Sequence, residues 1–362
     1  MINLQHKLIL LILFSVMLIA CTEDVDPVVI EKDETPFVLD YGNFPEPVLP
    51  ADNPLTEQGV ELGRMLFYET MLSKDGSQSC ASCHNLSDGF SDTLQFSIGV
   101  EKMEGKRQAM PIFNMAYHTN DFFWDGRAEL LRDQSLKPIE DPLEMNETLE
   151  NVVAKLSDTP LYKDQFTRVF GSDEITSEKM SLAMEQFMLS VISKDSKYDK
   201  FLAGELSLTE SEERGRMLFE TEYNPFFPEF SGADCLHCHS GFNFENDEYM
   251  NNGLDTDADI TDTGREKVTM NPMDRAKFKV PSLRNIEVTP PYMHDGRFNT
   301  LEEVVDHYNS GIKLSASLDP AIRNTEETGL FLTEQDKADL VNFLKTLTDE
   351  TFLNNNAYKS PF

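Results

Sequence analysis

The 362-residue sequence predicts an all-α protein of two domains related by internal duplication, and repeated motifs are the main reason. The motif Gly-Arg-Met-Leu-Phe occurs at 63–67 and again at 215–219. Each copy is followed by the motif Cys-x-x-Cys-His, at 80–84 and at 235–239. A third landmark is a proline that precedes Asp-Gly-Arg at the same distance in each half: Pro111 before 125–127 and Pro281 before 295–297. Three landmarks in the same order indicate two homologous domains side by side.

The pattern of apolar residues predicts helices joined by long loops. Apolar side chains recur at helical spacing in the stretches 56–67, 177–191 and 333–347, and the last of these opens on a capping signal. Stretches rich in Asn, Asp, Gly and Pro at 224–233 and 243–275 predict loops. Few stretches alternate with period two, so little sheet is expected. Short helices around long loops are typical of a small domain that is organised by a prosthetic group.

Composition restricts the class of partner. The chain carries 31 Lys and Arg against 64 Asp and Glu, a formal net charge of −33. Nucleic acids and anionic membrane surfaces would repel such a chain, so neither is expected as a partner. The acidic surface either keeps the protein solvated or attracts a basic partner protein, and composition alone does not choose between these readings.

The N-terminus indicates export. A mostly apolar run at 8–20 precedes Cys21. At about 1.5 Å per residue it cannot cross a hydrocarbon layer of about 30 Å, so it predicts a secretory signal rather than a spanning helix. Residues 18–21 resemble a bacterial lipobox, which implies acylation of Cys21; an ordinary signal with an incidental cysteine is the alternative. We expect a signal peptide at 1–20, an acidic, proline-rich tether at 21–50, and an exported lipoprotein that faces the periplasm or the cell surface.

The two Cys-x-x-Cys-His motifs predict two covalently bound c-type haems. The residues concerned are Cys80, Cys83, His84, Cys235, Cys238 and His239. The cysteine spacing matches the two vinyl groups of the porphyrin, and the adjacent histidine then reaches the iron as the proximal ligand. A zinc ribbon would need its cysteine pairs much closer in sequence. A thioredoxin-type redox pair would need a βαβ context that is absent from the pattern.

The order of these motifs resembles that of the bacterial di-haem cytochrome c peroxidases and their relative MauG, from about Leu55 to Thr348. Besides the attachment motifs, the resemblance rests on four segments: Phe-Trp-Asp-Gly-Arg at 123–127, Gln134 with Pro138 and Glu144, Val-Pro-Ser-Leu-Arg-Asn at 280–285, and Pro-Tyr-Met-His-Asp-Gly-Arg at 291–297. It implies a cytochrome c-like domain at 51–195 with the peroxidatic haem and another at 196–350 with the electron-transfer haem. A C-terminal tail at 351–362 follows.

The same resemblance assigns roles in the N-terminal domain. It makes His84 the proximal ligand of the haem that meets peroxide, with Gln134 and Glu144 as the distal pair. The chemistry agrees, because cleaving the O–O bond moves a proton between its oxygens; a carboxylate can carry that proton while an amide orients the peroxide. Trp124 would lie between the haems and relay charge, a role compatible with packing the domain junction.

One departure from the family pattern concerns the peroxide-binding iron. Many of these peroxidases close that iron with a histidine in a Ser-Ile-Gly-His segment, where this chain has Val100. Valine cannot ligate iron, so we expect an open or water-filled sixth position that needs no reductive activation. His118 is the only nearby histidine that could substitute.

A second departure concerns the C-terminal haem. The peroxidases usually have an axial methionine at the position that Tyr308 holds here, whereas MauG has a tyrosine. A phenolate is a hard anionic donor that lowers the potential of the iron, and a thioether raises it. We expect Tyr308 to be the ligand and its neighbour His307 not to be one. Three methionines are the alternatives: Met270, Met273 and Met293.

A calcium ion between the domains is a further implication of the resemblance. The matching positions are Gln108, Thr289 and Pro291. Gln108 stands where the family tends to have asparagine, so a longer side chain is involved.

These features together predict a peroxidase-type oxidoreductase. It would reduce hydrogen peroxide to water through a ferryl intermediate at the N-terminal haem, with electrons from a small c-type cytochrome or a cupredoxin. Two alternatives stay open: a MauG-type oxidase that uses peroxide to oxidise a protein or organic substrate, and a di-haem electron carrier without catalysis. The resemblance also allows a homodimer.

Overall fold

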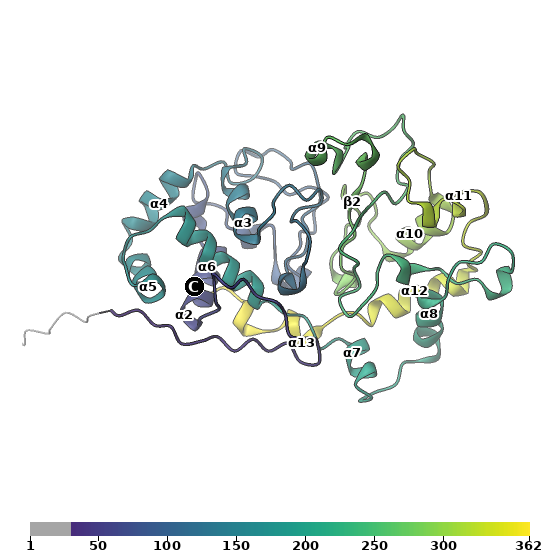
Figure 1. The fold of residues 1–362 in the computed structure, drawn as a ribbon, viewed down its shortest axis with the longest axis horizontal. Helices are drawn as coiled ribbons and strands as arrows, with labels where there is room; N and C mark the ends of the chain where they lie inside the picture. The colour runs from purple at the N-terminus through teal and green to yellow at the C-terminus, as the bar shows by residue number, and fades with distance from the viewer. Residues whose placement is uncertain (1–29) are drawn as a thin grey trace, which may run out of the picture. The chain divides into compact units, whose positions relative to one another are not determined.

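A computed structural model describes residues 30–362 of the chain (Figure 1). Over this range the protein is mostly helical, with a single two-stranded sheet, in agreement with the all-α prediction. Within the same range no helix is both long and apolar enough to cross a membrane. The predicted signal peptide at 1–20 and the acylation site Cys21 lie outside the described residues.

The predicted helices are present. Within the described part of the first half, the helices are α2 (Glu57–Tyr68), α3 (Leu131–Glu140), α4 (Leu149–Ser157), α5 (Pro160–Phe170) and α6 (Ser177–Ser190). Those of the second half are α7 (Lys197–Leu202), α8 (Glu210–Glu220), α9 (Glu266–Thr269), α10 (Leu301–Asp306), α11 (Thr325–Thr328), α12 (Glu334–Lys345) and α13 (Glu350–Leu353), with strands β1 (Tyr249–Met250) and β2 (Phe278–Lys279). Helices α2, α6 and α12 confirm the three apolar stretches. Threonine side chains cap their first turns, because Thr56, Thr176 and Thr333 each accept a backbone N–H bond.

The repeated Gly-Arg-Met-Leu-Phe motif lies in two closely packed helix pairs. Helix α2 packs against α6, and α8 packs against α12. A Cβ added to Gly63 would lie 2.0 Å from the carbonyl oxygen of Ala183, and one added to Gly215 would lie 1.9 Å from that of Asp339. Glycine is therefore required at both positions, because the backbones approach too closely for any side chain.

The residues that the structure describes form two hydrophobic cores. The N-terminal core is formed by buried residues of 55–192 together with Phe352, and the C-terminal core by buried residues of 198–347. In Figure 1, α2–α6 lie together on the left and α8, α10 and α12 lie together on the right.

The segments before residue 50 and after residue 350 both pack against the rest of the protein. The prediction of a tether at 21–50 that takes no part in a core is wrong for its later part, because Phe37, Leu39 and Leu49 pack against the N-terminal core and Phe44 is buried. The ring centroid of Phe44 lies 4.8 Å from that of Phe242. At the other end, α13 carries Phe352 into the N-terminal core, and the chain then returns beside α2 (Figure 1). Apolar side chains that can be buried hold both segments in place.

Candidate active site

The two Cys-x-x-Cys-His motifs adopt the same local backbone. Each opens on a 3-10 turn, Cys80–Ser82 in one half and Cys235–His237 in the other. The N–H of each histidine, His84 and His239, donates to the carbonyl of the first cysteine of its motif at 2.9 Å. The four cysteines of the motifs are free of disulfides, and each motif forms part of the wall of a cavity. Both sets of side chains are thus available for a ligand in that cavity.

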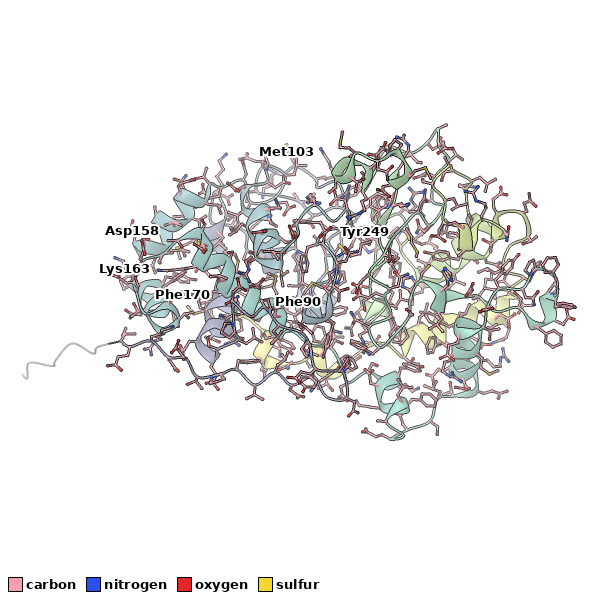
Figure 2. The ribbon with its side chains drawn as sticks, in the orientation of Figure 1. Phe90, Met103, Asp158, Lys163, Phe170 and Tyr249 are labelled. Carbon is pink, nitrogen blue, oxygen red and sulfur yellow. The ribbon has the colours of Figure 1, made fainter. Side chains whose placement is uncertain are left out.

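The hydrogen bonds of the two histidines select one imidazole tautomer. Nδ1 of His84 lies 3.0 Å from the carbonyl oxygen of Phe90, and Nδ1 of His239 lies 3.1 Å from the carbonyl oxygen of Phe244. Phe90 is labelled in Figure 2. A carbonyl only accepts, so Nδ1 carries the proton and Nε2 keeps its lone pair. Phe90 and Phe244 share a left-handed backbone, with φ of 57° and 54°.

Burial keeps these imidazoles neutral, because it lowers the pKa of His84 and of His239. A neutral imidazole with a free Nε2 and an oriented Nδ1–H is the form that binds a metal ion. Together with two free thiols per motif, it fits a covalently attached haem at each position.

The N-terminal cavity brings together the residues that the sequence placed in the peroxide site. Its wall includes Cys80, Cys83, His84, Gln134 and Glu144. Gln134 comes from α3, and Glu144 from the loop that follows this helix. Burial raises the pKa of Glu144 to about 7; the charge of Asp141 adds to this, and that of Arg127 opposes it. Near neutral pH this carboxyl can therefore both accept and return a proton.

The segment at 97–100 also contributes to this cavity. Ser97 and Gly99 line it, and Val100 follows directly. Met184 and Met188 of α6 also line the cavity, where the sequence predicted only an apolar helix. Among the described residues that line this cavity, Gln78 and Gln134 carry amides, Glu144 carries a carboxyl, and His84 is the one histidine.

The alternative ligand His118 is held elsewhere. Its Nδ1 lies 3.6 Å from the carboxylate of Glu245 and 3.8 Å from that of Asp247, while its Nε2 contacts the ammonium group of Lys279. His118 is not among the described residues that line either cavity. These contacts do not favour His118 as an iron ligand.

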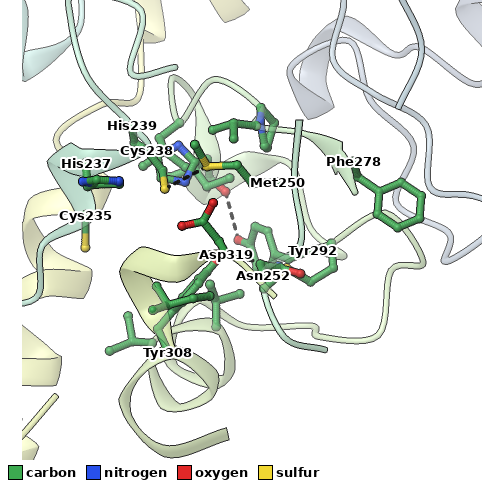
Figure 3. Close-up of a pocket in the computed structure, with 18 of the residues that line it drawn as sticks. Cys235, His237, Cys238, His239, Met250, Asn252, Phe278, Tyr292, Tyr308 and Asp319 are labelled. Atoms are coloured by element: carbon green, nitrogen blue, oxygen red, sulfur yellow. Dashed lines mark hydrogen bonds between the residues drawn. The ribbon is translucent and has the colours of Figure 1, made fainter. Parts of the chain in front are cut away.

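The C-terminal cavity contains the predicted axial tyrosine. Cys235, Cys238 and His239 line it, and Figure 3 shows Tyr308 and Asp319 entering from other segments of the chain. Tyr308 lies in a single π-helical turn, His307–Gly311, at the end of α10. Such turns occur frequently at functional sites.

Three methionines were named as alternatives to Tyr308, and their positions differ. Met293 lines the cavity, and the amide of Asn252 lies 3.2 Å from its sulfur and 3.4 Å from the hydroxyl of Tyr308. Met270 and Met273 are 82% and 63% exposed, so their sulfurs face solvent rather than this cavity.

Met250, which no sequence motif singles out, lines the same cavity, and its sulfur lies 3.3 Å from that of Cys238 (Figure 3). Its place depends on the pairing of β1 with β2, for which the sequence offered no signal. His307, the residue before Tyr308, does not line the cavity. Its Nε2 lies 2.9 Å from the carbonyl oxygen of Asn252.

Trp124 connects the two halves of the chain. Its indole N–H donates to the carbonyl of Gln108 at 2.8 Å, and its own carbonyl accepts from the N–H of Lys279 at 2.8 Å. Trp124 is buried and lines the C-terminal cavity, as do all three positions of the expected calcium site: Gln108, Thr289 and Pro291. The side-chain amide of Gln108 donates to Ser91 at 2.8 Å, so its nitrogen is already engaged.

Comparison with known proteins agrees with this arrangement. A family model described as di-haem cytochrome c peroxidase matches residues 57–207. The chain is 37% identical to the cytochrome c551 peroxidase of Nitrosomonas europaea, over 84% of this chain and 85% of that protein. It is 36% identical to the methylamine utilization protein MauG of Methylorubrum extorquens, over 83% and 81%. A crystal structure of a MauG-like protein associated with microbial copper homeostasis superimposes with a TM-score of 0.77 at 34% identity, covering 90% of this chain and 98% of the other. At this identity over most of both chains, the protein belongs to the di-haem cytochrome c peroxidase family and is an oxidoreductase of that class.

Proposed function

We propose that this protein reduces hydrogen peroxide to water with electrons from a small c-type cytochrome or a cupredoxin. The observation that carries the proposal is the N-terminal cavity, where Gln134 and Glu144 share a wall with Cys80, Cys83 and His84. A carboxyl and an amide beside a haem-attachment motif supply the groups that peroxide cleavage needs.

The proposed cofactors are two haem c groups. Cys80, Cys83 and His84 would hold one, and Cys235, Cys238 and His239 the other. When bound, the haems would supply the iron at which the O–O bond breaks and a second redox centre for one of the two electrons. Peroxide takes up two electrons and two protons and leaves as two water molecules.

The protein's own part in the reaction is proton transfer and orientation. The Glu144 carboxylate takes a proton from the incoming peroxide and returns it to the departing oxygen, while the Gln134 amide holds the peroxide by hydrogen bonding. A carboxyl with a pKa of about 7 suits both steps near neutral pH. Trp124, buried between the segments around Gln108 and Lys279, serves as the path for charge between the halves.

For the domain organisation we propose a duplicated chain with domains at 51–195 and 196–350. The matched packing of Gly63 on α6 and Gly215 on α12 supports this division, as do the two separate hydrophobic cores. Export as a lipoprotein acylated at Cys21 and a calcium ion held near Gln108 remain proposals that rest on the sequence.

One observation favours a second function, a MauG-type oxidase that uses peroxide to oxidise a protein or organic substrate. Tyr308, which the sequence predicts as the axial ligand in place of a methionine, lines the C-terminal cavity. A phenolate ligand would stabilise the oxidised iron and make that centre a poorer acceptor of electrons from a cytochrome.

Two measurements on the purified protein test the proposal. Steady-state consumption of peroxide with a reduced c-type cytochrome should be rapid, and the EPR spectrum of the oxidised protein should contain a high-spin ferric signal. Negligible turnover together with a long-lived oxidised spectrum would favour the oxidase. Two low-spin signals and no reaction with peroxide would identify an electron carrier instead.

A further inference from the structure

Three exposed phenylalanines lie close together in the loop at 224–231, which we call the phenylalanine loop. Phe226, Phe227 and Phe230 are 85%, 57% and 71% exposed. A single exposed apolar side chain is ordinary in a protein, but several large rings in one short segment mark a surface that is covered by a partner.

Hydrogen bonds order this loop. The side chain of Asn224 accepts from the backbone N–H groups of two of the phenylalanines at 3.1 Å, and the Asn224 N–H donates to the hydroxyl of Ser231 at 2.9 Å. At the base of the loop the N–H of Gly232 donates to the carbonyl of Glu222 at 3.0 Å. A Cβ on Gly232 would lie 2.0 Å from the carbonyl oxygen of Thr221, so the base closes only with glycine. The turn therefore presents its rings to solvent from an ordered frame.

The phenylalanine loop borders the C-terminal cavity. Tyr223, which precedes it, and Asp234, which follows it, both line that cavity, as do Cys235 and His237. Between these two lies Leu236, which is 40% exposed. A partner seated on the loop would therefore lie against the wall that carries the second haem-attachment motif.

The rim of this surface is acidic. The sequence from 219 to 234 contains no lysine or arginine and four acids: Glu222, Glu229, Asp234, and Glu220, whose carboxylate is paired with Arg216 of α8. Exposed Glu326 and Glu327 add to the rim on α11, which is joined to the loop by a hydrogen bond between Thr328 and Tyr223. A complementary partner would have an apolar centre ringed by lysines. Anionic lipid would be repelled.

We propose that the phenylalanine loop is the docking surface for the electron donor, a small redox protein with an apolar face and a basic rim. The inference rests on the proposed function, because it assumes that electrons enter through the C-terminal cavity. The rings supply contact area at the centre of the interface, and the acids raise the rate of encounter.

The test compares a protein donor with a donor too small to need a docking surface. In the double variant Phe226→Ser/Phe230→Ser, the KM for a small basic c-type cytochrome should rise about tenfold. Peroxide turnover with the organic dye ABTS as donor should not change. The matched control is Leu161→Ser, a 46% exposed residue on α5 at the other end of the ribbon, which should alter neither value (Figure 1).

A charge variant provides an independent arm. Glu222→Lys/Glu229→Lys should raise the KM for the basic cytochrome and flatten its dependence on salt, whereas for the same cytochrome with acetylated lysines the KM should stay the same or fall. If the serine double variant also loses ABTS turnover, its fold is damaged and the charge variant decides the question.

The outcomes separate this inference from the proposed function. Unchanged KM values in both variants would overturn the docking surface. The docking surface would also be overturned if the variants altered only self-association, measured by sedimentation, because a second copy of the chain would then be the occupant. Variants that altered only binding to phosphatidylcholine vesicles would identify a lipid surface as the occupant instead. Calorimetry that shows loop-dependent binding of the cytochrome without any peroxide turnover would refute the proposed function and leave the docking surface in place.

Discussion

The backbone N–H of Val100 donates a hydrogen bond of 2.9 Å to the carbonyl oxygen of Glu144. The residue before it, Gly99, approaches the same stretch so closely that a Cβ would lie 2.1 Å from the carbonyl oxygen of Leu143. The segment in which many related peroxidases carry a histidine is therefore packed against the segment that carries the proposed catalytic carboxyl. The main chain at position 100 is therefore hydrogen-bonded directly to the main chain of Glu144.

Val100→His should close the N-terminal haem site. An imidazole at this position can supply the sixth iron ligand, so the high-spin ferric EPR signal should become low-spin. Peroxide turnover should fall at least about tenfold until the protein is first reduced by one electron. Val100→Leu, which adds bulk without a ligand, is the control and should keep the high-spin signal. A histidine variant that stays high-spin and fully active would contradict the assignment of this segment.

Glu144→Gln should lower the rate of the peroxide reaction by about a hundredfold or more, because an amide cannot carry the proton. Both haems should remain attached, as measured by the pyridine haemochrome spectrum. Glu140→Gln, at the exposed end of α3, is the matched control and should be fully active. Wild-type rates in Glu144→Gln would remove this carboxyl from the mechanism.

The peroxide reaction should also depend on pH through the same group. Burial raises the pKa of Glu144 to about 7, so the carboxylate that accepts the proton is scarce below pH 6 and predominates above pH 8. The second-order rate constant, measured by stopped flow, should therefore rise with pH through about 7. Asp141→Asn should move this midpoint to lower pH, since the charge of Asp141 contributes to the raised pKa. A flat wild-type profile would be evidence against Glu144 as the base.

Tyr308→Met should raise the reduction potential of the C-terminal haem by on the order of 100 mV, because a thioether replaces an anionic oxygen. Potentiometric titration followed by optical spectra measures this directly. Tyr292→Phe changes another tyrosine of the same cavity and should leave the potential unchanged. If the potential of Tyr308→Met equals that of the wild type, another residue holds the axial position, and Met250 or Met293 becomes the candidate.

Gly63→Ala and Gly215→Ala should each destabilise the fold. The added methyl groups would lie 2.0 Å from the carbonyl oxygen of Ala183 and 1.9 Å from that of Asp339, so each helix pair must separate. The expected loss is about 1–3 kcal/mol of unfolding free energy for each, measured by chemical denaturation of the holoprotein. Gly105→Ala is the control, because its nearest neighbour would lie at 3.6 Å. Wild-type stability in both variants would mean that the helix pairs are more loosely packed than described.

Features that depend on a few consecutive residues could be predicted from the sequence. The attachment motifs bring their thiols and imidazole together through one short turn, and the caps at Thr56 and Thr333 use bonds within the first helical turn. Gln134 and Glu144 were found because they stand at a recognisable distance along the chain, and the structure brings both to the wall of one cavity.

Contacts between distant segments were decided by the tertiary structure alone. Met250 reaches the sulfur of Cys238 only because β1 pairs with β2, and Met270 is exposed although it is no farther from the second motif in sequence than Met293. Phe44 is buried against the other half of the chain within a stretch that composition classed as a tether. The sequence by itself determined which chemical groups the protein carries and how each motif folds locally, because those are short-range properties. Which side chains face a cavity depends on the packing of segments far apart in the chain, and no local pattern encodes that choice.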